Sequence, residues 1–374
     1  MHTPAITGTG VFTPEQVITN AELVEAFNAY ADRMNAENAA AIESGEMEPM
    51  AHSSEEFIVK ASGIEQRHVL DKTGILDPQV MHPLFRQRSD EEPSLMAEMA
   101  LDAAKKALAQ ADRSPEDIDL VICAASNMER AYPAMAIEIQ NLLGIDGFAF
   151  DMNVACSSAT FGIQAAADMV RAGSIRAALV VNPEICSGHL EWRDRDCHFI
   201  FGDVATACVI ERMEAAEGPS FEILSTRCAT QFSNNIRNNN GFLRRTRPDG
   251  VADRRDMQFM QNGRKVFKEV VPMVSQHIAA HMTETGIESS ALKRMWLHQA
   301  NKSMNDLIGK KVLGRTPEPE EQPNILQDYA NTSSAGSIIA FSQNSGDLAE
   351  GDIGLICSFG AGYSVGSVLL RRHI

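Results

Sequence analysis

The sequence predicts an α/β protein made of two similar halves. Apolar segments of strand length alternate with amphipathic segments of helix length along most of the chain, and the second half repeats this alternation. The halves also end alike, with TACVIER at residues 206–212 and GSVLLRR at residues 366–372. Because the EAAEGP segment after the first ending is the best candidate boundary, we expect one half at residues 1–212 and the other at residues 219–374.

In the first half, apolar runs indicate strands, and apolar residues at three- and four-residue spacing indicate helices. Thr19 with Glu22 forms a capping box that predicts a helix through about Phe27, and Ser53 with Glu56 predicts the start of another. The remaining strands and helices of this half are expected at residues 5–11, 118–126, 148–152, 177–182 and 203–211 for strands, and at residues 94–111, 135–143 and about 157–171 for helices.

Two segments of the first half, near residues 28–52 and 70–92, follow neither pattern. The first is polar with several Met and Glu residues, and the second combines Pro, Gly and mixed charges, which predicts a long loop. Loops of this length usually serve as lids or interface arms, or are disordered. We expect both segments to be insertions.

The second half begins with a predicted strand at residues 221–228, followed by a loop rich in Asn and Arg. A long amphipathic helix is expected from about residue 257 to residue 285, and a short strand at residues 295–297. Two more helices and an apolar strand at residues 353–359 complete the half.

The charge balance limits the possible partners. The chain has 33 basic and 50 acidic residues, a formal net charge of -17, which repels phosphate backbones and anionic membranes. No window approaches the roughly 18 uninterrupted apolar residues of a membrane helix. The seven cysteines form no close pair of the CxxC type, which argues against a disulfide framework or a zinc site. We expect a cytoplasmic protein without nucleic acid, metal or membrane span.

Cys156 has the local surroundings of a nucleophile. The predicted strand at residues 148–152 precedes it and a predicted helix follows, so the thiol lies at a strand-to-helix turn. Ser157 and Ser158 are good N-cap residues, and the N–H groups and positive dipole end of that helix are expected to lower the thiol pKa. The same N–H groups could hold an oxyanion. The alternative is a small apolar residue packed under a helix, the commoner role of cysteine.

Two other polar residues stand out in the second half. His298 directly follows the short strand in WLHQANKS, where a loop residue is held rigidly at a sheet edge. Asn331 precedes a helix start in YANTSSAGS. Together with Cys156 they would supply a nucleophile and two hydrogen-bond donors. Taken singly, each has a common structural explanation, a satisfied core histidine for one and a cap or turn residue for the other.

The order Cys, His, Asn is also found in thiol proteases. The separation of Cys156 from His298 fits that class, but no CGSCW-like sequence surrounds the cysteine, and the cysteine lies in the middle of the chain. We keep a protease as a minor alternative.

Two further motifs invite functional explanations. SFGAGYSVG at residues 358–366 predicts a tight turn whose backbone can approach a ligand closely, but its glycine spacing does not match a dinucleotide site. HIAAH at residues 277–281 has the spacing of a zinc site but lacks the glutamate and lies on an amphipathic helix. We expect no metal there.

The region from Ser233 to Lys268 is locally basic, with nine basic against three acidic residues. A basic face on an acidic protein indicates a specific anionic partner, although a solvated face without a partner is as common.

Taken together, the motifs resemble those of the 3-oxoacyl-(acyl-carrier-protein) synthase III family of thiolase-like condensing enzymes. The resemblance covers nearly the whole chain, and its most specific segments are DMNVACSSATFG, IFGDVATACVIE, WLHQAN, YANTSSAGS and SFGAGYSVGS. It implies a duplicated thiolase-like fold of five α/β/α/β/α layers, a homodimer, and a tunnel with Cys156, His298 and Asn331 at its base. The two insertions would make this chain a longer member than most.

The resemblance also implies a mechanism and no cofactor. Cys156 would take an acyl group from acyl-CoA, with the backbone N–H groups of Cys156 and Ala361 as the oxyanion hole. His298 and Asn331 would bind the malonyl thioester of acyl carrier protein and stabilise the enolate left by decarboxylation. The enolate would attack the acyl-cysteine and give 3-oxoacyl-carrier protein for fatty acid synthesis.

The remaining site residues follow from the same resemblance. Tyr132, from the partner subunit, and Phe359 would shape the acyl pocket, and the insertions weakly favour medium-chain primers. The residues expected to contact CoA are Phe57, Arg195, Gly263 and Phe267, where Ala61 replaces a common arginine. The residues expected to dock the carrier protein are Arg244, Arg245, Arg264 and Lys302.

Two alternatives stay open within this fold. One is an enzyme with another acceptor, of the hydroxymethylglutaryl-CoA, quinolone-forming or head-to-head condensing type, and the last would need a glutamate base, for which Glu129 is the nearest candidate. The other is a non-catalytic subunit that binds acyl chains, against which the joint presence of Cys156, His298 and Asn331 argues.

Overall fold

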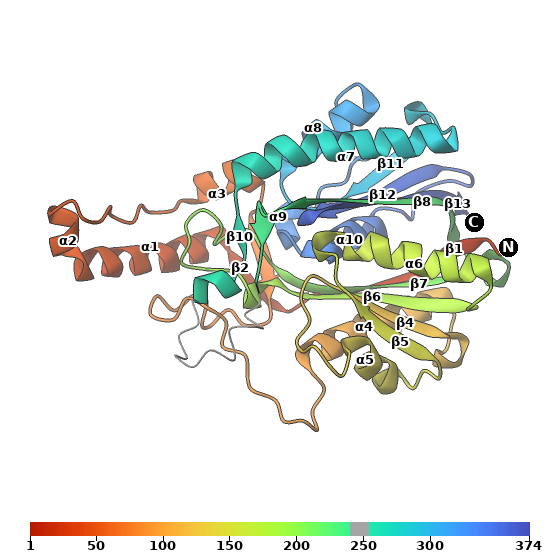
Figure 1. The fold of residues 1–374 in the computed structure, drawn as a ribbon, viewed down its shortest axis with the longest axis horizontal. Coiled ribbons are helices and arrows are strands. Elements are labelled where there is room, and N and C mark those ends of the chain that lie inside the picture. Colours follow the sequence, from red (N-terminus) through yellow and green to blue (C-terminus); the bar gives the residue numbers. More distant parts are fainter. Residues whose placement is uncertain (240–253) are drawn as a thin grey trace.

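The computed structural model describes residues 1–239 and 254–374. One sheet of nine strands organises this part of the chain (Figure 1). In order across the sheet, its strands are β11 (Leu292–Leu297), β12 (Ile353–Gly360), β13 (Gly362–His373), β8 (Ser220–Ser233), β1 (Pro4–Phe12), β7 (Asp203–Arg212), β6 (Ala177–Ile185), β4 (Leu120–Ala124) and β5 (Phe148–Met152). Two small sheets pair β2 (Gln16–Thr19) with β3 (Gln66–Val69), and β9 (Ile236–Arg237) with β10 (Met260–Gln261).

The strand order shows the predicted duplication. β1 and β8 meet in the middle through only two residue pairs, and outward from them each side has two antiparallel pairings followed by a parallel one. The first half adds β5 at its edge, parallel to β4. The similar endings TACVIER and GSVLLRR lie in β7 and β13, the equivalent strands beside the central pair. The α/β prediction is confirmed, and this symmetry supports the proposed division near residues 212–219.

Helices lie in three layers around the strands (Figure 1). α6 (Ser158–Ala172) and α10 (Gly336–Gln343) are central and pack against strands of both halves. α4 (Leu95–Ala111) and α5 (Met135–Leu143) cover the outer face of the first half, and α7 (Gly263–Thr285) and α8 (Lys302–Leu313) cover that of the second. Because α6 and α10 lie between the strands of the first half and those of the second, the layers follow the order helix, strand, helix, strand, helix. None of the helices in the described ranges combines the length and apolar character that a membrane span requires.

Two glycines in β1 let α4 pack unusually close to the sheet. A Cβ on Gly8 would lie 2.2 Å from the carbonyl oxygen of Ala107, and a Cβ on Gly10 would lie 2.0 Å from that of Ala103. Both alanines are fully buried. A side chain at either glycine would meet the backbone of α4. The close packing of β1 on α4 therefore depends on glycine in the strand and alanine in the helix.

The segment at residues 28–52 differs from the prediction. α1 runs from Asn20 to Glu37 instead of ending near Phe27, and with the short α2 (Ala39–Glu43) it forms an arm that projects from the body (Figure 1). The side chain of Asn28 bonds both backbone groups of Ser53, and that of Asn35 bonds both backbone groups of Met50. These long-range amide contacts hold the returning chain against α1.

Other helix boundaries were placed a few residues wrong. Ser54 instead of Ser53 caps α3 (Glu55–Ser62), and α7 begins at Gly263 instead of near residue 257, because Asn262 caps it by accepting from the N–H of Lys265. The capping box of Thr19 and Glu22 is confirmed. As predicted, no helix or strand lies between Val69 and Leu95.

The packing of β1 on α4 predicts a strong effect of one methyl group. We expect Gly10→Ala to lower the free energy of unfolding by about 1–3 kcal/mol, because the new Cβ must push α4 away from β1. Urea unfolding would measure this change. The matched control is Gly218→Ala, since a Cβ there meets nothing within 4 Å, and equal unfolding midpoints for the two variants would contradict the proposed contact.

Candidate active site

Cys156 lies at a sharp turn between β5 and α6. Ala155, just before it, has φ of 47°, in the left-handed region that non-glycine residues rarely adopt. The N–H of Ala155 donates to Oδ1 of Asn153 (3.0 Å), and the Ser158 hydroxyl accepts from the N–H of Val154 (2.8 Å) and donates to the carbonyl of Ala155 (2.7 Å). The turn was predicted correctly. Ser157 occupies the N-cap position of α6, as predicted, but makes no side-chain capping bond, and Ser158 is the first helical residue and bonds back to the turn.

The predicted lowering of the Cys156 pKa is wrong in sign. Burial raises the pKa of this thiol to about 11, although the Ser333 hydroxyl (Oγ to Sγ 3.4 Å) and the backbone N–H groups of Ala361 and Cys156 act in the opposite direction. Loss of hydration outweighs the helix terminus here. The two N–H groups are the ones expected to form the oxyanion hole, and both interact with the sulfur.

His298 follows β11 and is fixed on three sides. Its N–H donates to the carbonyl of Cys357 (2.8 Å), its carbonyl accepts from Nδ2 of Asn305 (2.9 Å), and its ring packs edge-on against Phe359, with 5.2 Å between centroids. Burial lowers the pKa of the imidazole to about 4. Its Nδ1 is buried without a hydrogen-bond partner among the described residues. The ring is therefore a neutral group at neutral pH.

Asn331 follows α9 (Leu326–Tyr329) and is held by its backbone and by its side-chain oxygen. Its N–H donates to the carbonyl of Ile200 (3.0 Å), its carbonyl accepts from Gly202 (3.1 Å), and its Oδ1 accepts from the N–H of Ser333 (2.8 Å). Because the amide oxygen is bound inside the protein, the NH₂ group on the other side of the amide is the one left for a ligand.

One cavity of about 550 Å³ joins these three residues. Cys156, His298 and Asn331 all line it, although they come from turns 142 and 33 residues apart. Of the other expected site residues, the structure places five on its walls: Phe57, Gly263, Arg264, Phe267 and Phe359. This arrangement agrees with the prediction that Cys156, His298 and Asn331 lie at one site.

Other expected residues lie elsewhere. Arg195 places its guanidinium over the ring of Phe57, 4.1 Å from the centroid, and donates to the carbonyl of His52 (2.7 Å). Lys302 is exposed and pairs with Asp306 (2.7 Å). Tyr132 is 85% exposed, and with Ala361 it lines a second cavity, of about 1040 Å³, that also reaches Cys156. Arg244 and Arg245 lie outside the described residues.

The sequence analysis missed three residues of the site. Gly360 packs on Cys156, and a Cβ there would lie 2.5 Å from the Cβ of that cysteine. Ser333 bonds the sulfur. Glu184 is buried behind the site, where burial raises its pKa to about 7 and it accepts from the N–H groups of Ser126 (3.0 Å) and Ser334 (3.2 Å). Glu184 lay beyond the strand expected at residues 177–182, whereas β6 continues to Ile185 and includes it.

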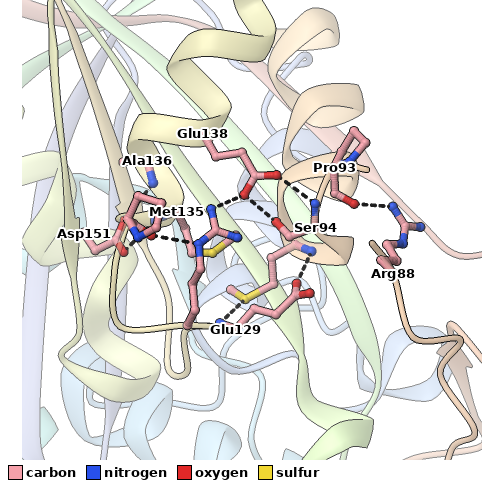
Figure 2. Close-up of polar contacts among 11 residues, drawn as sticks. Arg88, Pro93, Ser94, Glu129, Met135, Ala136, Glu138 and Asp151 are labelled. Carbon is pink, nitrogen blue, oxygen red and sulfur yellow. Dashed lines mark hydrogen bonds and ion pairs between the residues drawn. The ribbon is translucent and has the colours of Figure 1, made fainter. Parts of the chain in front are cut away.

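Glu129 is used by the fold near the site. Figure 2 shows that its carboxylate accepts from the N–H of Met96 (3.0 Å) in the first turn of α4, while its own N–H contacts the Met96 sulfur (3.2 Å). In the same network, Glu138 accepts from the N–H and hydroxyl of Ser94 and pairs with Arg130. Glu129 therefore anchors the loop before α5 to α4 through Oε2, and it also lines the cavity that reaches Cys156.

The HIAAH histidines also have structural partners. His277 and His281 both contact the hydroxyl of Ser367 on β13, at 3.0 Å and 2.7 Å, and His281 contacts Ser225 on β8 at 3.0 Å. They join α7 to the sheet. Within the described ranges, no group of three side chains is placed to hold a metal ion.

The raised thiol pKa predicts the pH dependence of alkylation. With a pKa of about 11, the thiolate fraction of Cys156 grows about tenfold per pH unit, so the iodoacetamide rate at this residue should rise tenfold per unit from pH 7 to pH 10. Peptide mass spectrometry would follow Cys156 alone, with Cys156→Ser defining the background. A plateau below pH 9 would show that the helix terminus outweighs burial.

Comparison with known proteins agrees with this geometry. The models of 3-oxoacyl-(acyl-carrier-protein) synthase III and of its C-terminal part match residues 150–231 and 282–372. The chain is 56% identical to the beta-ketodecanoyl-(acyl-carrier-protein) synthase of Pseudomonas aeruginosa over 94% of this chain and all of that protein. It is 32% identical to the beta-ketoacyl-(acyl-carrier-protein) synthase III of Mesorhizobium japonicum, over 88% and 94% of the two chains.

A solved structure confirms the fold. The 3-oxoacyl-(acyl-carrier-protein) synthase III of Aquifex aeolicus superimposes with a TM-score of 0.77 at 26% identity, covering 98% of this chain and 99% of that one. The similarity in sequence and in structure covers most of the chain, and the cysteine, histidine and asparagine line one cavity. The chain belongs to the 3-oxoacyl-(acyl-carrier-protein) synthase III family of thiolase-like condensing enzymes.

Proposed function

We propose that this enzyme condenses an acyl-CoA primer of medium length with malonyl-carrier protein, giving 3-oxoacyl-carrier protein, CO₂ and CoA. Membership of the family supports the class of reaction, which is acyl transfer by condensation in fatty acid synthesis. The primer length rests on the 56% identical relative, whose name specifies a ten-carbon 3-oxoacyl product. Because the condensation adds two carbons, such a product requires a primer of about eight carbons.

In the first step, we assign Cys156 as the nucleophile. Its sulfur attacks the thioester carbonyl of acyl-CoA, the carbon–sulfur bond to CoA breaks, and the thiol proton ends on the released CoA. The backbone N–H groups of Cys156 and Ala361 already interact with the sulfur, so they are close to where the oxyanion develops. Fixed donors in a water-poor site stabilise such charge strongly.

In the second step, we assign His298 and Asn331 as donors to the malonyl thioester carbonyl. Loss of CO₂ leaves an enolate, whose oxygen they stabilise, and the enolate carbon attacks the acyl-cysteine and expels the Cys156 thiolate. The low pKa of His298, about 4, keeps the ring neutral, so it acts as a hydrogen-bond donor. The chemistry needs no cofactor, because both substrates arrive as activated thioesters.

The cavity that reaches Cys156 supports the proposed CoA path. Phe57, Gly263 and Phe267 line it, and the stacked pair of Arg195 on Phe57 offers a flat cationic surface for an adenine ring and its phosphates. Arg264 lines this cavity, and Lys302 directly follows Asn301, which also lines it. We propose that these two basic residues bind carrier protein, with Arg244 and Arg245 as further candidates outside the described residues.

We propose that the enzyme is a homodimer that pairs along β5. This strand is an edge of the sheet, and Phe148 on it and Ile137 on the neighbouring α5 are each 47% exposed. Tyr132 and Phe232, 85% and 86% exposed, line the cavity that reaches Cys156. Covering these apolar side chains with a second copy would bury the aromatic rings and let Tyr132 close the acyl pocket of the partner subunit.

The cytoplasm is the proposed location. All seven cysteines are free, which fits a reducing compartment. The alternatives with another acceptor or a non-catalytic role are less favoured, because the synthase III relatives match nearly the whole chain and Glu129 is engaged with α4.

Intact-protein mass spectrometry tests the proposed function. After incubation with acyl-CoAs of two to twelve carbons, we expect the wild type to gain one acyl group, most readily near eight carbons, and Cys156→Ser to gain none. His298→Ala and Asn331→Ala should keep this loading but lose about 100- to 1000-fold in condensation with malonyl-carrier protein, because each removes an enolate donor. Loading of Cys156→Ser, or none of the wild type, would refute the assignment.

The homodimer has a separate test. We expect Phe148→Asp to raise the dimer dissociation constant about tenfold or more, because pairing would bury an unpaired charge. Light scattering after size exclusion would measure the mass, with Met47→Asp on the arm as the matched control for an exposed apolar residue. A Phe148→Asp protein that stays dimeric at the same concentrations as the control would rule out pairing along β5.

A further inference from the structure

A third cavity, of about 560 Å³, lies behind the one that contains Cys156 and Tyr132. It is walled by the loop before α4, the start of α4 and the end of β6. Both cavities are lined by Asn127, Met128, Glu129, His189 and Asn238. These five residues therefore form the partition between the cavity at Cys156 and the adjoining one. We call the rear cavity the distal chamber; its apolar lining residues are Phe85, Leu95, Met96, Met128, Ile185 and Met257.

The distal chamber has an apolar wall, formed by the six residues named above, and a polar remainder that includes Arg86, Arg88 and Glu129. Its two cationic side chains are already paired, Arg86 with Glu92 (Nη1 to Oε2 3.0 Å) and Arg88 with the carbonyl of Pro93 (2.6 Å) and with Glu98. The carbon stems of such arginines can cover apolar surface while their charges stay satisfied. A methyl-ended hydrocarbon fits this lining better than a chain that ends in a carboxylate.

The partition is built so that a side chain can move while the backbone stays fixed. Figure 2 shows Glu129 tied to Met96 and Glu138 tied to Ser94, which anchors the loop that carries Met128. The thioether of Met128 contacts Cys123 at 4.0 Å, and such unbranched side chains adapt their rotamers readily. On the other side, burial lowers the pKa of His189 to about 4, so the partition holds no imidazolium that would oppose an apolar chain.

We propose that the distal chamber binds the tail of the acyl primer, which passes from Cys156 between Met128 and His189 and ends among Phe85, Leu95 and Ile185. The proposal rests on the proposed function and adds the residues that select chain length. The long loop at residues 70–92 thereby acquires a role, since Phe85 belongs to it. Each methylene removed from water favours binding by about fourfold, so the chamber would matter for long primers and not for acetyl.

Two substitutions would fill the chamber from different sides. Leu95→Trp enlarges a half-buried side chain of its wall. Gly188→Val adds a side chain whose Cβ would lie 3.3 Å from Phe85 and 3.7 Å from Ile185, an approach that needs only a small shift. Leu84→Trp is the matched control, because Leu84 lies on the same loop, is 55% exposed and does not line the chamber.

The readout is the ratio of octanoyl or dodecanoyl to acetyl loading on Cys156, measured by intact mass at equal times. Because it compares primers on one preparation, the ratio does not depend on the folded fraction. We expect it to fall tenfold or more in both chamber variants and to stay at the wild-type value in Leu84→Trp. An unchanged ratio in both chamber variants, or an equal fall in the control, would overturn the proposal. Absence of any wild-type adduct would instead refute the proposed function.

Discussion

The close approach of Gly360 to Cys156 is the contact on which the site depends. Gly360 ends β12 in the second half, whereas Cys156 begins the turn after β5 in the first, and no side chain fits between them. With the backbone of β12 fixed against the nucleophile, the following residue, Ala361, brings its N–H to the sulfur, and the preceding one, Phe359, supports the ring of His298. The two halves thus share one site because a glycine lets their backbones meet.

Burial then determines the charge state of the site. It raises the pKa of Cys156 and of Glu184 and lowers that of His298, so each of these groups is shifted towards its neutral form. A neutral imidazole suits an enzyme that must stabilise an enolate by hydrogen bonding. Because of this burial, the helix terminus alone does not ionise the Cys156 thiol. The backbone N–H donors at the sulfur stabilise the negative charge that develops during the reaction.

Local periodicity predicted most strands of the nine-stranded sheet, most helices and the turn at Cys156, because each of these depends on neighbouring residues, but it missed the short strands β2, β3, β9 and β10. It failed where distant residues decide. α1 continues past Phe27 because Asn28 and Asn35 bind a segment some 15 to 25 residues further on. The sign of the Cys156 shift depends on the depth of burial, which no local pattern contains. The position of Arg195 on Phe57 likewise results from packing between segments far apart in the chain.

The duplication explains why the site has two kinds of parts. Ala155 and Ser333 both have left-handed φ, 47° and 51°, and each opens a short 3₁₀ turn that leads into a central helix, α6 in one half and α10 in the other. Such conformations cost on the order of 1–3 kcal/mol each and persist where the surroundings hold them. One turn carries Cys156, and its counterpart carries Ser333, whose N–H donates to Oδ1 of Asn331. Glu184 bonds the second turn through Ser334 and the loop after β4 through Ser126. Two copies of one strained turn therefore meet at the site, where the Ser333 hydroxyl of one lies 3.4 Å from the Cys156 sulfur of the other.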